Sequence, residues 1–396
     1  METPPVDDSN PALRTLIAQR VAASPGGRLN FAQFMDLALY HPELGYYATH
    51  PGRIGGWGDY ITAAHLGSDF GELLAVQAAQ LWRHLGKPEG FDFVEMGAGQ
   101  GLFAADFLRH AHANLPDFAA ALDYRIVERS AAQLAEQRRV LAGLPVRWCD
   151  LEQIAPDSVA GCFFANELVD ALPVHQFVVH RGELLEIYVA LEGERDFVEV
   201  AAAPSTPRLA AFLDRCGIAT APLGEGYRSE VNLAALDWLE AVARRLARGY
   251  VLTVDYGYTA RQYYAPQHRS GTLACYHRHR VHDNPYLHIG NQDITAHVNF
   301  TALQTHGAAY ALRSLGFTRQ SFFLLALGLG ERLAALGAPG AIENNAQLNA
   351  ALRRREALRT LVDPGSMGDF GVLIQGKNTD PDLPLAGLSL PAQTLS

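Results

Sequence analysis

Cysteine is scarce in this chain, and the few cysteines show no regular spacing. The four residues, Cys149, Cys162, Cys216 and Cys275, include no C-x-x-C pair. This pattern argues against a disulfide framework and against a zinc knuckle. A reducing compartment is therefore expected.

Long apolar runs are also absent. The longest nearly unbroken run, residues 322–329, is far shorter than the ~20 residues that a membrane-spanning helix requires. The first residues are acidic and show neither the hydrophobic segment of a signal peptide nor the arginines of a transit peptide. The sequence thus predicts no membrane insertion and a cytoplasmic location.

The chain lacks an excess of positive charge. Its formal net charge is −10, which argues against non-specific binding to a phosphate backbone, so nucleic acid is not the expected substrate. Hydrophobic residues make up 48% of the 396 residues, enough for a large globular core in one or two domains. No repeats or low-complexity tracts are present.

The most informative stretch joins an apolar run to a cluster of glycines. FDFVEMGAGQG, residues 91–101, reads as a buried strand that enters a tight turn, and LFAADFLRH then opens a helix. Glycine allows positive φ and lets backbone N–H groups approach a ligand closely, while the helix N-terminus adds partial positive charge. Strand, turn and helix together predict the first unit of a doubly wound nucleotide fold.

The glycine spacing distinguishes between nucleotides. The dinucleotide fingerprint G-x-G-x-x-G would need its third glycine at position 102, which is Leu102, and no Gly-Lys-Ser/Thr follows to form a P-loop. The pattern acid-x-Gly-x-Gly-x-Gly, formed by Glu95, Gly97, Gly99 and Gly101, resembles instead the first motif of S-adenosylmethionine-dependent methyltransferases. The alternative is that these glycines serve tight packing alone.

Strands and helices alternate after residue 90, which predicts an α/β fold with a doubly wound, mostly parallel, Rossmann-like sheet. Residues 314–323 and 367–377 could add a final antiparallel pair, separated by a helix at about 345–361. Two to three alternating runs between residues 176 and 201 suggest a hairpin insertion or, equally, edge strands of the sheet. A clear helix is expected between an N-cap at Ser229 and a stop at Gly249.

These patterns predict four regions. They are an N-terminal helical cap (1–88), a cofactor-binding core (89–258, with a hairpin insertion at about 176–228), a substrate-side insertion (259–310) and a C-terminal completion of the core (311–396).

The carboxyl ends of parallel strands gather the functional groups of such a fold. Glu128 ends the second strand, where a carboxylate can accept both ribose hydroxyls, although a surface charge that opens the next helix is the alternative. Asp150 ends the third strand and can accept from the adenine amino group, with the backbone N–H of Leu151 beside it. An N-cap role for Asp150 is equally compatible with the sequence.

Polar groups also follow the fourth strand directly, in FFANELVDALPVHQF (163–177). Asn166, Glu167 and Asp170 lie where a methyl donor should point, so they are the candidate catalytic residues. If the segment turns helically, Glu167 and Asp170 share one side, and two carboxylates there would suit a guanidinium between them. Capping of a turn by Asn166 and Asp170 is the alternative.

Segments along nearly the whole chain resemble the MidA-like family of methyltransferases, which includes a mitochondrial arginine methyltransferase. The resemblance rests on FMDLALYHPELGYY (34–47), GDYITA (58–63), EMGAGQG, ANELVDALPVHQF, EVNLAALDWL (230–239), VDYGY (254–258) and the region 271–300. It implies a seven-strand methyltransferase fold, S-adenosyl-L-methionine as cofactor and a protein arginine as acceptor. Where the family has Thr-x-Pro-Glu-x-Ser, this chain has TAAHLG (62–67), which puts any role of that Glu or Ser in doubt.

The His-rich, aromatic region 259–310 is expected to contact the substrate protein or to close over the cleft. The candidate substrate-binding residues are His175, His277, Asp293, His297 and Asn299. No metal is expected, because Arg278 and Arg280 lie between the histidines and no Cys or acid completes a tetrahedral spacing.

The predicted function is methyl transfer from S-adenosyl-L-methionine to an arginine nitrogen of a protein. Two alternatives remain open. One is a methyltransferase that acts on another nucleophile or on a small molecule, and the other is a non-catalytic assembly factor that binds the cofactor.

Overall fold

The computed structural model describes residues 7–50, 62–193, 196–336 and 344–390. Its centre is a seven-stranded sheet with the strand order β16-β17-β10-β5-β2-β3-β4. The strands are β2 (Phe91–Met96), β3 (Leu122–Val127), β4 (Val146–Cys149), β5 (Val159–Asn166), β10 (Leu246–Asp255), β16 (Arg313–Arg319) and β17 (Gly371–Lys377). Only β17 runs antiparallel to its neighbours, so the predicted mostly parallel sheet and its final antiparallel pair are confirmed.

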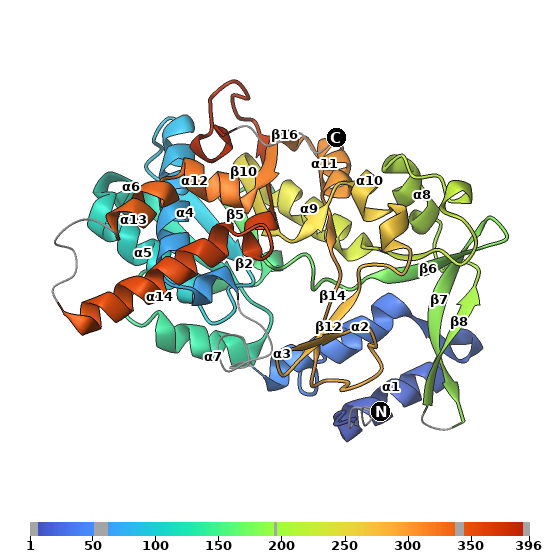
Figure 1. Cartoon of the computed structure of the whole chain (residues 1–396). Coiled ribbons are helices and arrows are strands. Elements are labelled where there is room, and N and C mark those ends of the chain that lie inside the picture. Colours follow the sequence, from blue (N-terminus) through green and yellow to red (C-terminus); the bar gives the residue numbers. More distant parts are fainter. Residues whose placement is uncertain (1–6, 51–61, 194–195, 337–343, 391–396) are drawn as a thin grey trace.

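Helices cover both faces of this sheet, because its central strands are apolar on both sides (Figure 1). Neighbouring residues alternate between the faces, so Phe93 packs into one core and Val94 into the other. The first core is built with α4 (Asp69–His84), α5 (Leu102–Asn114), α6 (Pro116–Ala121), α12 (Gln320–Ala326) and α14 (Asn345–Val362). The second core is built with α9 (Leu233–Arg245) and α11 (Phe300–Ala308).

A second, five-stranded sheet lies beside the first and contains the strands between residues 175 and 231 together with one strand near the N-terminus. Its members are β1 (Arg28–Asn30), β6 (His175–His180), β7 (Glu183–Glu192), β8 (Asp196–Ala202) and β9 (Arg228–Val231). These strands do not join an edge of the seven-stranded sheet, so the edge-strand alternative is wrong. The apolar faces of α1 (Pro11–Ala23) and α2 (Phe31–Tyr40) pack against this sheet instead.

The boundaries of the predicted helix before β10 differ from the expectation. Ser229 lies inside β9, paired with Phe177, and Asn232 is the N-cap that accepts a hydrogen bond from the Ala235 N–H at 2.8 Å. The helix ends at Arg245, and Gly249 lies within β10, where its φ of +138° and the close approach of Gly161 exclude a side chain. A glycine that reads as a helix stop therefore serves strand packing.

The remaining elements connect these layers. They are α3 (Tyr46–Thr49), α7 (Ala131–Val140), α8 (Arg208–Arg215), α10 (Ala260–Tyr263), α13 (Leu329–Ala335), β11 (Gly257–Tyr258), β12 (Ala274–His277), β13 (Arg280–His282), β14 (Asp293–Thr295) and β15 (Val298–Asn299). Among the described residues, no helix combines the length and the apolar character needed to cross a bilayer. The glycine-rich stretch 51–58 and most of GDYITA lie outside the described residues, and the four predicted regions stay a prediction.

Candidate active site

The glycine turn leaves β2 with its backbone bare. Gly97, Gly99 and Gly101 have φ values of +71°, +51° and +80°, a left-handed region that residues with side chains rarely adopt. A Cβ on Gly97 would lie 2.9 Å from the Leu168 side chain, whereas a Cβ on Gly99 would meet no atom within 4 Å. Gly97 is thus required by packing, and Gly99 leaves space open.

The side chain of Gln137 on α7 holds the glycine turn in place, and no pattern in the sequence predicted this contact. The side chain is fully buried, and its amide nitrogen donates to the Gly99 carbonyl at 2.8 Å and to a Glu128 carboxylate oxygen at 2.9 Å. Its amide oxygen accepts from the Trp148 indole at 3.1 Å. One amide therefore ties the glycine turn to the ends of β3 and β4.

A pocket of about 520 Å³ opens over the glycine turn. It is lined by Thr62, Ala64, His65, Glu95, Gly97, Ala98, Gly99, Gln100, Leu102, Phe103, Asn166 and Glu167. Glu95 is buried and accepts from the Tyr124 hydroxyl at 2.7 Å, and burial raises its pKa to about 8. Three of these residues, Glu95, Gly97 and Gly99, were predicted through the glycine motif, and Asn166 and Glu167 through the segment after β5. Gly101 does not line the pocket and packs against Leu141 instead, and the sequence did not predict His65 or Gln100.

Two of the predicted cofactor contacts have polar partners of their own. The Glu128 carboxylate accepts from the Ser130 N–H at 2.8 Å and from Gln137, yet each carboxylate oxygen keeps a free lone pair for a hydroxyl donor. Asp150 is exposed and forms the N-cap of the turn Leu151–Gln153, so the capping alternative is confirmed and the adenine contact stays a prediction.

These features fit S-adenosylmethionine. The open space at Gly99 admits a ligand against bare backbone, and buried Glu95 offers a carboxyl group to a ligand cation. Glu128 offers acceptors for a diol at the adjacent strand end, linked to the turn through Gln137. When bound, this cofactor supplies a methyl group activated by a sulfonium.

The segment after β5 places an acid at the mouth of this pocket. Glu167 adopts a left-handed φ of +48°, and its N–H donates to the Val254 carbonyl at 2.9 Å. Its carboxylate accepts from the Ala63 N–H at 3.3 Å and from the Asn166 amide at 3.2 Å. Burial, with a contribution from the Asp170 charge, raises the pKa of Glu167 to about 8. Strained backbone of this kind in a non-glycine residue often marks a functional site.

Asp170 lies behind Glu167, but not through the helical turn that the spacing suggested. The chain from 167 to 172 forms bends and turns, so the left-handed Glu167 and the turn bring the two carboxyls near each other. Asp170 is buried, and its Oδ1 has no hydrogen-bond partner among the described residues. Burial raises its pKa to about 6, although a hydrogen bond from the Tyr256 hydroxyl opposes the shift.

A third carboxyl, that of Asp255, was not predicted as a site residue. Asp255 ends β10 beside the end of β5 and is fully buried. Its Oδ2 accepts the N–H groups of Val169 at 3.0 Å and Asp170 at 3.3 Å, and its Oδ1 accepts the Tyr256 N–H at 2.9 Å. Burial raises the pKa of Asp255, and the charges of Asp170 and Glu167 raise it further. The available signal was its position at the end of the neighbouring strand.

The predicted substrate-binding residues do not form one group. Asp293 is buried, accepts from the Tyr47 hydroxyl at 2.8 Å, and lies close enough to influence the same tyrosine, Tyr40, as Asp170 does. His297 stacks on Tyr258 with ring centroids 5.0 Å apart, and burial lowers its pKa to about 4. For Asp293 and His297, contact with the substrate therefore stays a prediction.

The other three predicted substrate residues have structural partners. His175 pairs with Glu186 at 2.7 Å within the second sheet, and Asn299 is the N-cap of α11. His277 stacks on His288 with centroids 4.0 Å apart, and both rings face the Asp8 carboxylate. Their substrate contacts remain predictions.

The group Asp8, His277 and His288 offers three potential metal ligands. The two rings are nearly parallel, at 10°, so their lone pairs do not converge, and the Arg278 guanidinium already pairs with Asp8 at 2.9 Å. This geometry is more typical of an ion-pair network, and the absence of a metal stays a prediction.

Glu128→Ala tests the predicted ribose contact. We expect it to weaken binding of S-adenosylhomocysteine by about 1–3 kcal/mol, the range for the loss of hydrogen bonds to a charged group. Titration calorimetry measures the effect, with Glu136→Ala as control, because Glu136 lies on the neighbouring α7 and forms a surface ion pair with Arg139. Equal affinities of the two variants would contradict the ribose assignment.

Curated relatives share most of the chain. The mitochondrial protein arginine methyltransferase NDUFAF7 of Mus musculus is 28% identical over 389 residues, which cover 91% of this chain and 82% of the relative. The Homo sapiens protein of that name is 25% identical over 388 residues, with 91% and 81% covered. Because these relatives are mitochondrial, the predicted cytoplasmic location is contradicted; an acidic, cysteine-poor composition does not distinguish between reducing compartments.

Solved structures share the whole architecture. A protein from Burkholderia thailandensis bound to S-adenosyl-homocysteine is 30% identical, with a TM-score of 0.85 and 99% of each chain covered. A native structure of a protein from the same organism gives 29% identity, a TM-score of 0.82 and the same coverage. The model of an S-adenosyl-L-methionine-dependent methyltransferase family matches residues 73–318, from α4 to β16. The chain therefore belongs to the MidA-like family of S-adenosyl-L-methionine-dependent methyltransferases.

Proposed function

We propose that this methyltransferase transfers the methyl group to an arginine nitrogen of a protein substrate. The observation that carries the proposal is the position of Glu167, which lines the cofactor pocket and has two further buried acids, Asp170 and Asp255, behind it. The relatives named as protein arginine methyltransferases support the same acceptor.

A guanidinium suits this cluster of acids. Buried carboxyls that cannot find a cation hold protons instead, which is the state that their raised pKa values describe. A guanidinium supplies the missing charge through paired hydrogen bonds to carboxylates, and it is planar and always protonated. The tyrosines around Asp170, Tyr40, Tyr256 and Tyr276, add aromatic surface for a cation.

The acids can also accept the proton that methyl transfer releases. Methyl transfer forms an N–C bond, leaves the former C–S electron pair on sulfur and leaves one proton too many on the guanidinium. Glu167 can orient the accepting nitrogen by binding its N–H groups, and a carboxylate at that position can take the released proton. Exclusion of water and in-line placement supply the rest of the rate.

Proton release tests the electrostatics of the pocket without a protein substrate. Without a bound cation, Glu167 holds its proton up to a pKa of about 8, and a cation lowers that pKa, so binding of a cation near pH 7 releases protons. S-adenosylmethionine carries a sulfonium and S-adenosylhomocysteine does not. We therefore expect the former to release more protons on binding.

Calorimetry in two buffers of different ionisation enthalpy counts these protons. The groups that face Glu167 and contribute to the count are Asp170, Asp255, Glu95, His65 and Tyr276. Glu167→Gln should abolish most of the difference between the two ligands. Equal proton release for both ligands in the unmodified protein would show that Glu167 does not sense the sulfonium.

The acceptor itself is tested with methyl-labelled cofactor and an extract of cells that lack the gene. We expect labelled methylarginine in a protein band, found by mass spectrometry, and none with Glu167→Gln. Label on another residue or on a small molecule would support the alternative acceptor. Cofactor binding with no label transferred would support the assembly factor.

A further inference from the structure

The turn that follows Glu167 is held from two sides by residues outside the cofactor pocket. On one side, the buried Asp255 carboxylate accepts the N–H groups of Val169 and Asp170. On the other side, the Asn232 amide donates to the carbonyls of Val169 at 3.1 Å and Leu172 at 3.4 Å. Donors and acceptors of the same turn are therefore fixed by side chains from β10 and from the start of α9.

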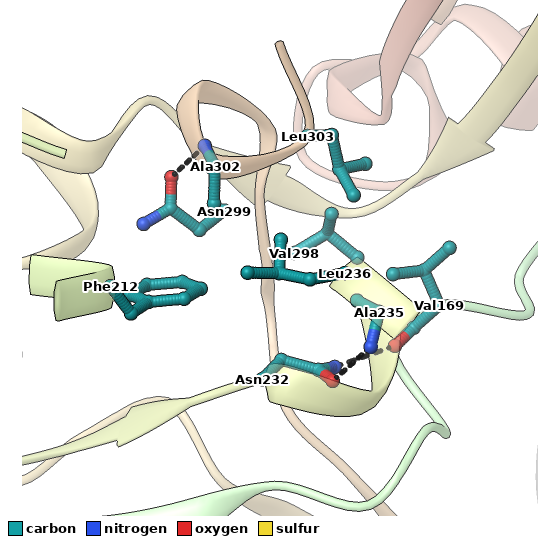
Figure 2. A pocket seen from close by; sticks show the side chains of 9 residues that line it. All are labelled: Val169, Phe212, Asn232, Ala235, Leu236, Val298, Asn299, Ala302 and Leu303. Carbon is teal, nitrogen blue, oxygen red and sulfur yellow. Dashed lines mark hydrogen bonds between the residues drawn. The ribbon is translucent and has the colours of Figure 1, made fainter. Parts of the chain in front are cut away.

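Figure 2 shows the Asn232 side of this arrangement. The Asn232 amide oxygen caps α9 through the Ala235 N–H, and its nitrogen donates directly to the Val169 carbonyl at the edge of a small hollow that both residues line. The hollow is lined mainly by apolar side chains, among them Phe212, Leu236 and Val298 (Figure 2). Because apolar neighbours offer no alternative partners, the bond from Asn232 sets the position of the turn on this side.

We propose that Asp255 and Asn232 are positioning residues for methyl transfer, which clamp the 169–172 turn and thereby hold Glu167 and Asp170 toward the substrate cation. The proposal rests on the proposed function for the identity of that cation. Glu167 needs such support, because its left-handed backbone is strained and its N–H is held only by Val254, the residue before Asp255. The two residues hold different groups of the turn, its N–H groups and its carbonyls, so their contributions can be tested separately.

Asp255 belongs to a group of buried acids. Asp170 and Glu167 are the acids that influence it, the Tyr256 hydroxyl donates to Asp170, and His297 packs edge-on against Tyr256 and is neutral at pH 7. Burial and these two acids raise the pKa of Asp255, so Asp255 acts on Glu167 through the turn that it holds and not through its own charge. Release of the turn on either side lets the Glu167 carboxyl reach water, which favours its ionised form.

The test compares Asp255→Asn with Asn232→Asp. Both should leave S-adenosylhomocysteine affinity within a few-fold and lower kcat by about 10- to 100-fold, because the acids are misdirected. Carboxyl ¹³C shifts of labelled glutamate, assigned with Glu167→Gln, give the Glu167 titration midpoint without any substrate. This midpoint should fall by about one pH unit in both variants, because a released turn lets the Glu167 carboxyl reach water. Asn232→Asp keeps an oxygen for the α9 cap.

Matched controls separate the clamp from general damage. Asp92→Asn removes another carboxylate that holds a backbone N–H, that of Ala160, at the far end of the sheet. Asn344→Asp alters another asparagine N-cap, that of α14. Both controls should keep kcat and the Glu167 midpoint.

An unchanged Glu167 midpoint in folded Asp255→Asn would overturn the role of Asp255, and unchanged kcat in Asn232→Asp would overturn that of Asn232. If Asp255→Asn does not fold, Asp255→Glu decides, because its longer carboxyl should displace the turn and lower both kcat and the Glu167 midpoint; unchanged values would overturn the role of Asp255. The midpoints need no acceptor, so they remain informative even if the methylated atom is not an arginine nitrogen.

Discussion

Gly99→Val is expected to abolish measurable binding of S-adenosylmethionine while the protein stays folded. Gly99 lines the pocket, and a Cβ there would point into space that holds no atom of the described residues within 4 Å. A branched side chain would fill space that we assign to the cofactor and would strain a backbone with φ +51°, at a cost of roughly 1–2 kcal/mol. We expect the affinity for S-adenosylmethionine to fall by more than about 100-fold, because the valine side chain both blocks contact with the cofactor and distorts the backbone of the turn.

Gly143→Val is the matched control for this experiment. Gly143 also has a positive φ, +82°, and open space around its Cβ, but it lies in the exposed turn after α7. It should lose a similar amount of stability in thermal unfolding and keep its cofactor affinity in calorimetry. Full affinity of Gly99→Val would show that the cofactor does not approach this turn.

Glu167→Gln should keep cofactor affinity within a few-fold and lose most methyl transfer to arginine, by about 100-fold or more. The amide has nearly the same shape, but it cannot carry the charge that a guanidinium needs or accept the released proton. Asp170→Asn should be milder, because Asp170 lies behind Glu167 and Asp255 remains beside it. Initial rates with labelled cofactor and an identified substrate measure both effects.

The control for this substitution is Glu230→Gln. Glu230 is a buried acid like Asp170 and Asp255, but it lies within β9 of the second sheet and accepts from the Thr272 N–H at 2.9 Å. This variant should keep turnover even where it costs stability. Full turnover of Glu167→Gln on an arginine substrate would disprove the carboxylate clamp, and a methylated atom other than an arginine nitrogen would favour the alternative acceptor.

Residues 62–67 differ from the family motif in their side chains, but the contact of this segment with Glu167 is made by the backbone. The family motif has a Glu and a Ser where this chain has His65 and Gly67, so a role for those two family side chains is in doubt here. In the fold, the Ala63 backbone N–H donates to Glu167, and Ala64 and His65 line the pocket. A backbone donor is available from any residue except proline, so the substitution does not remove this contact.

Sequence alone determined the parts of this protein that depend on local order along the chain. The alternation of apolar strands with helices specified the sheet, and the glycine spacing after Glu95 specified a turn with three left-handed residues, because both follow from neighbours a few positions apart. Glu167 and Asp170 were found because polar residues directly after a buried strand reach the carboxyl edge of the sheet.

Only the tertiary structure decided which distant residues complete the site. Asp255 lies 85 positions after Asp170 and reaches it because β10 pairs with β5. Asn232 reaches the same turn because it joins β9 of the second sheet to α9, which packs against the seven-stranded sheet. Gln137 joins the glycine turn to Glu128 through α7 in the same way. Such contacts are set by strand order and helix packing, which the spacing of residues along one segment does not encode.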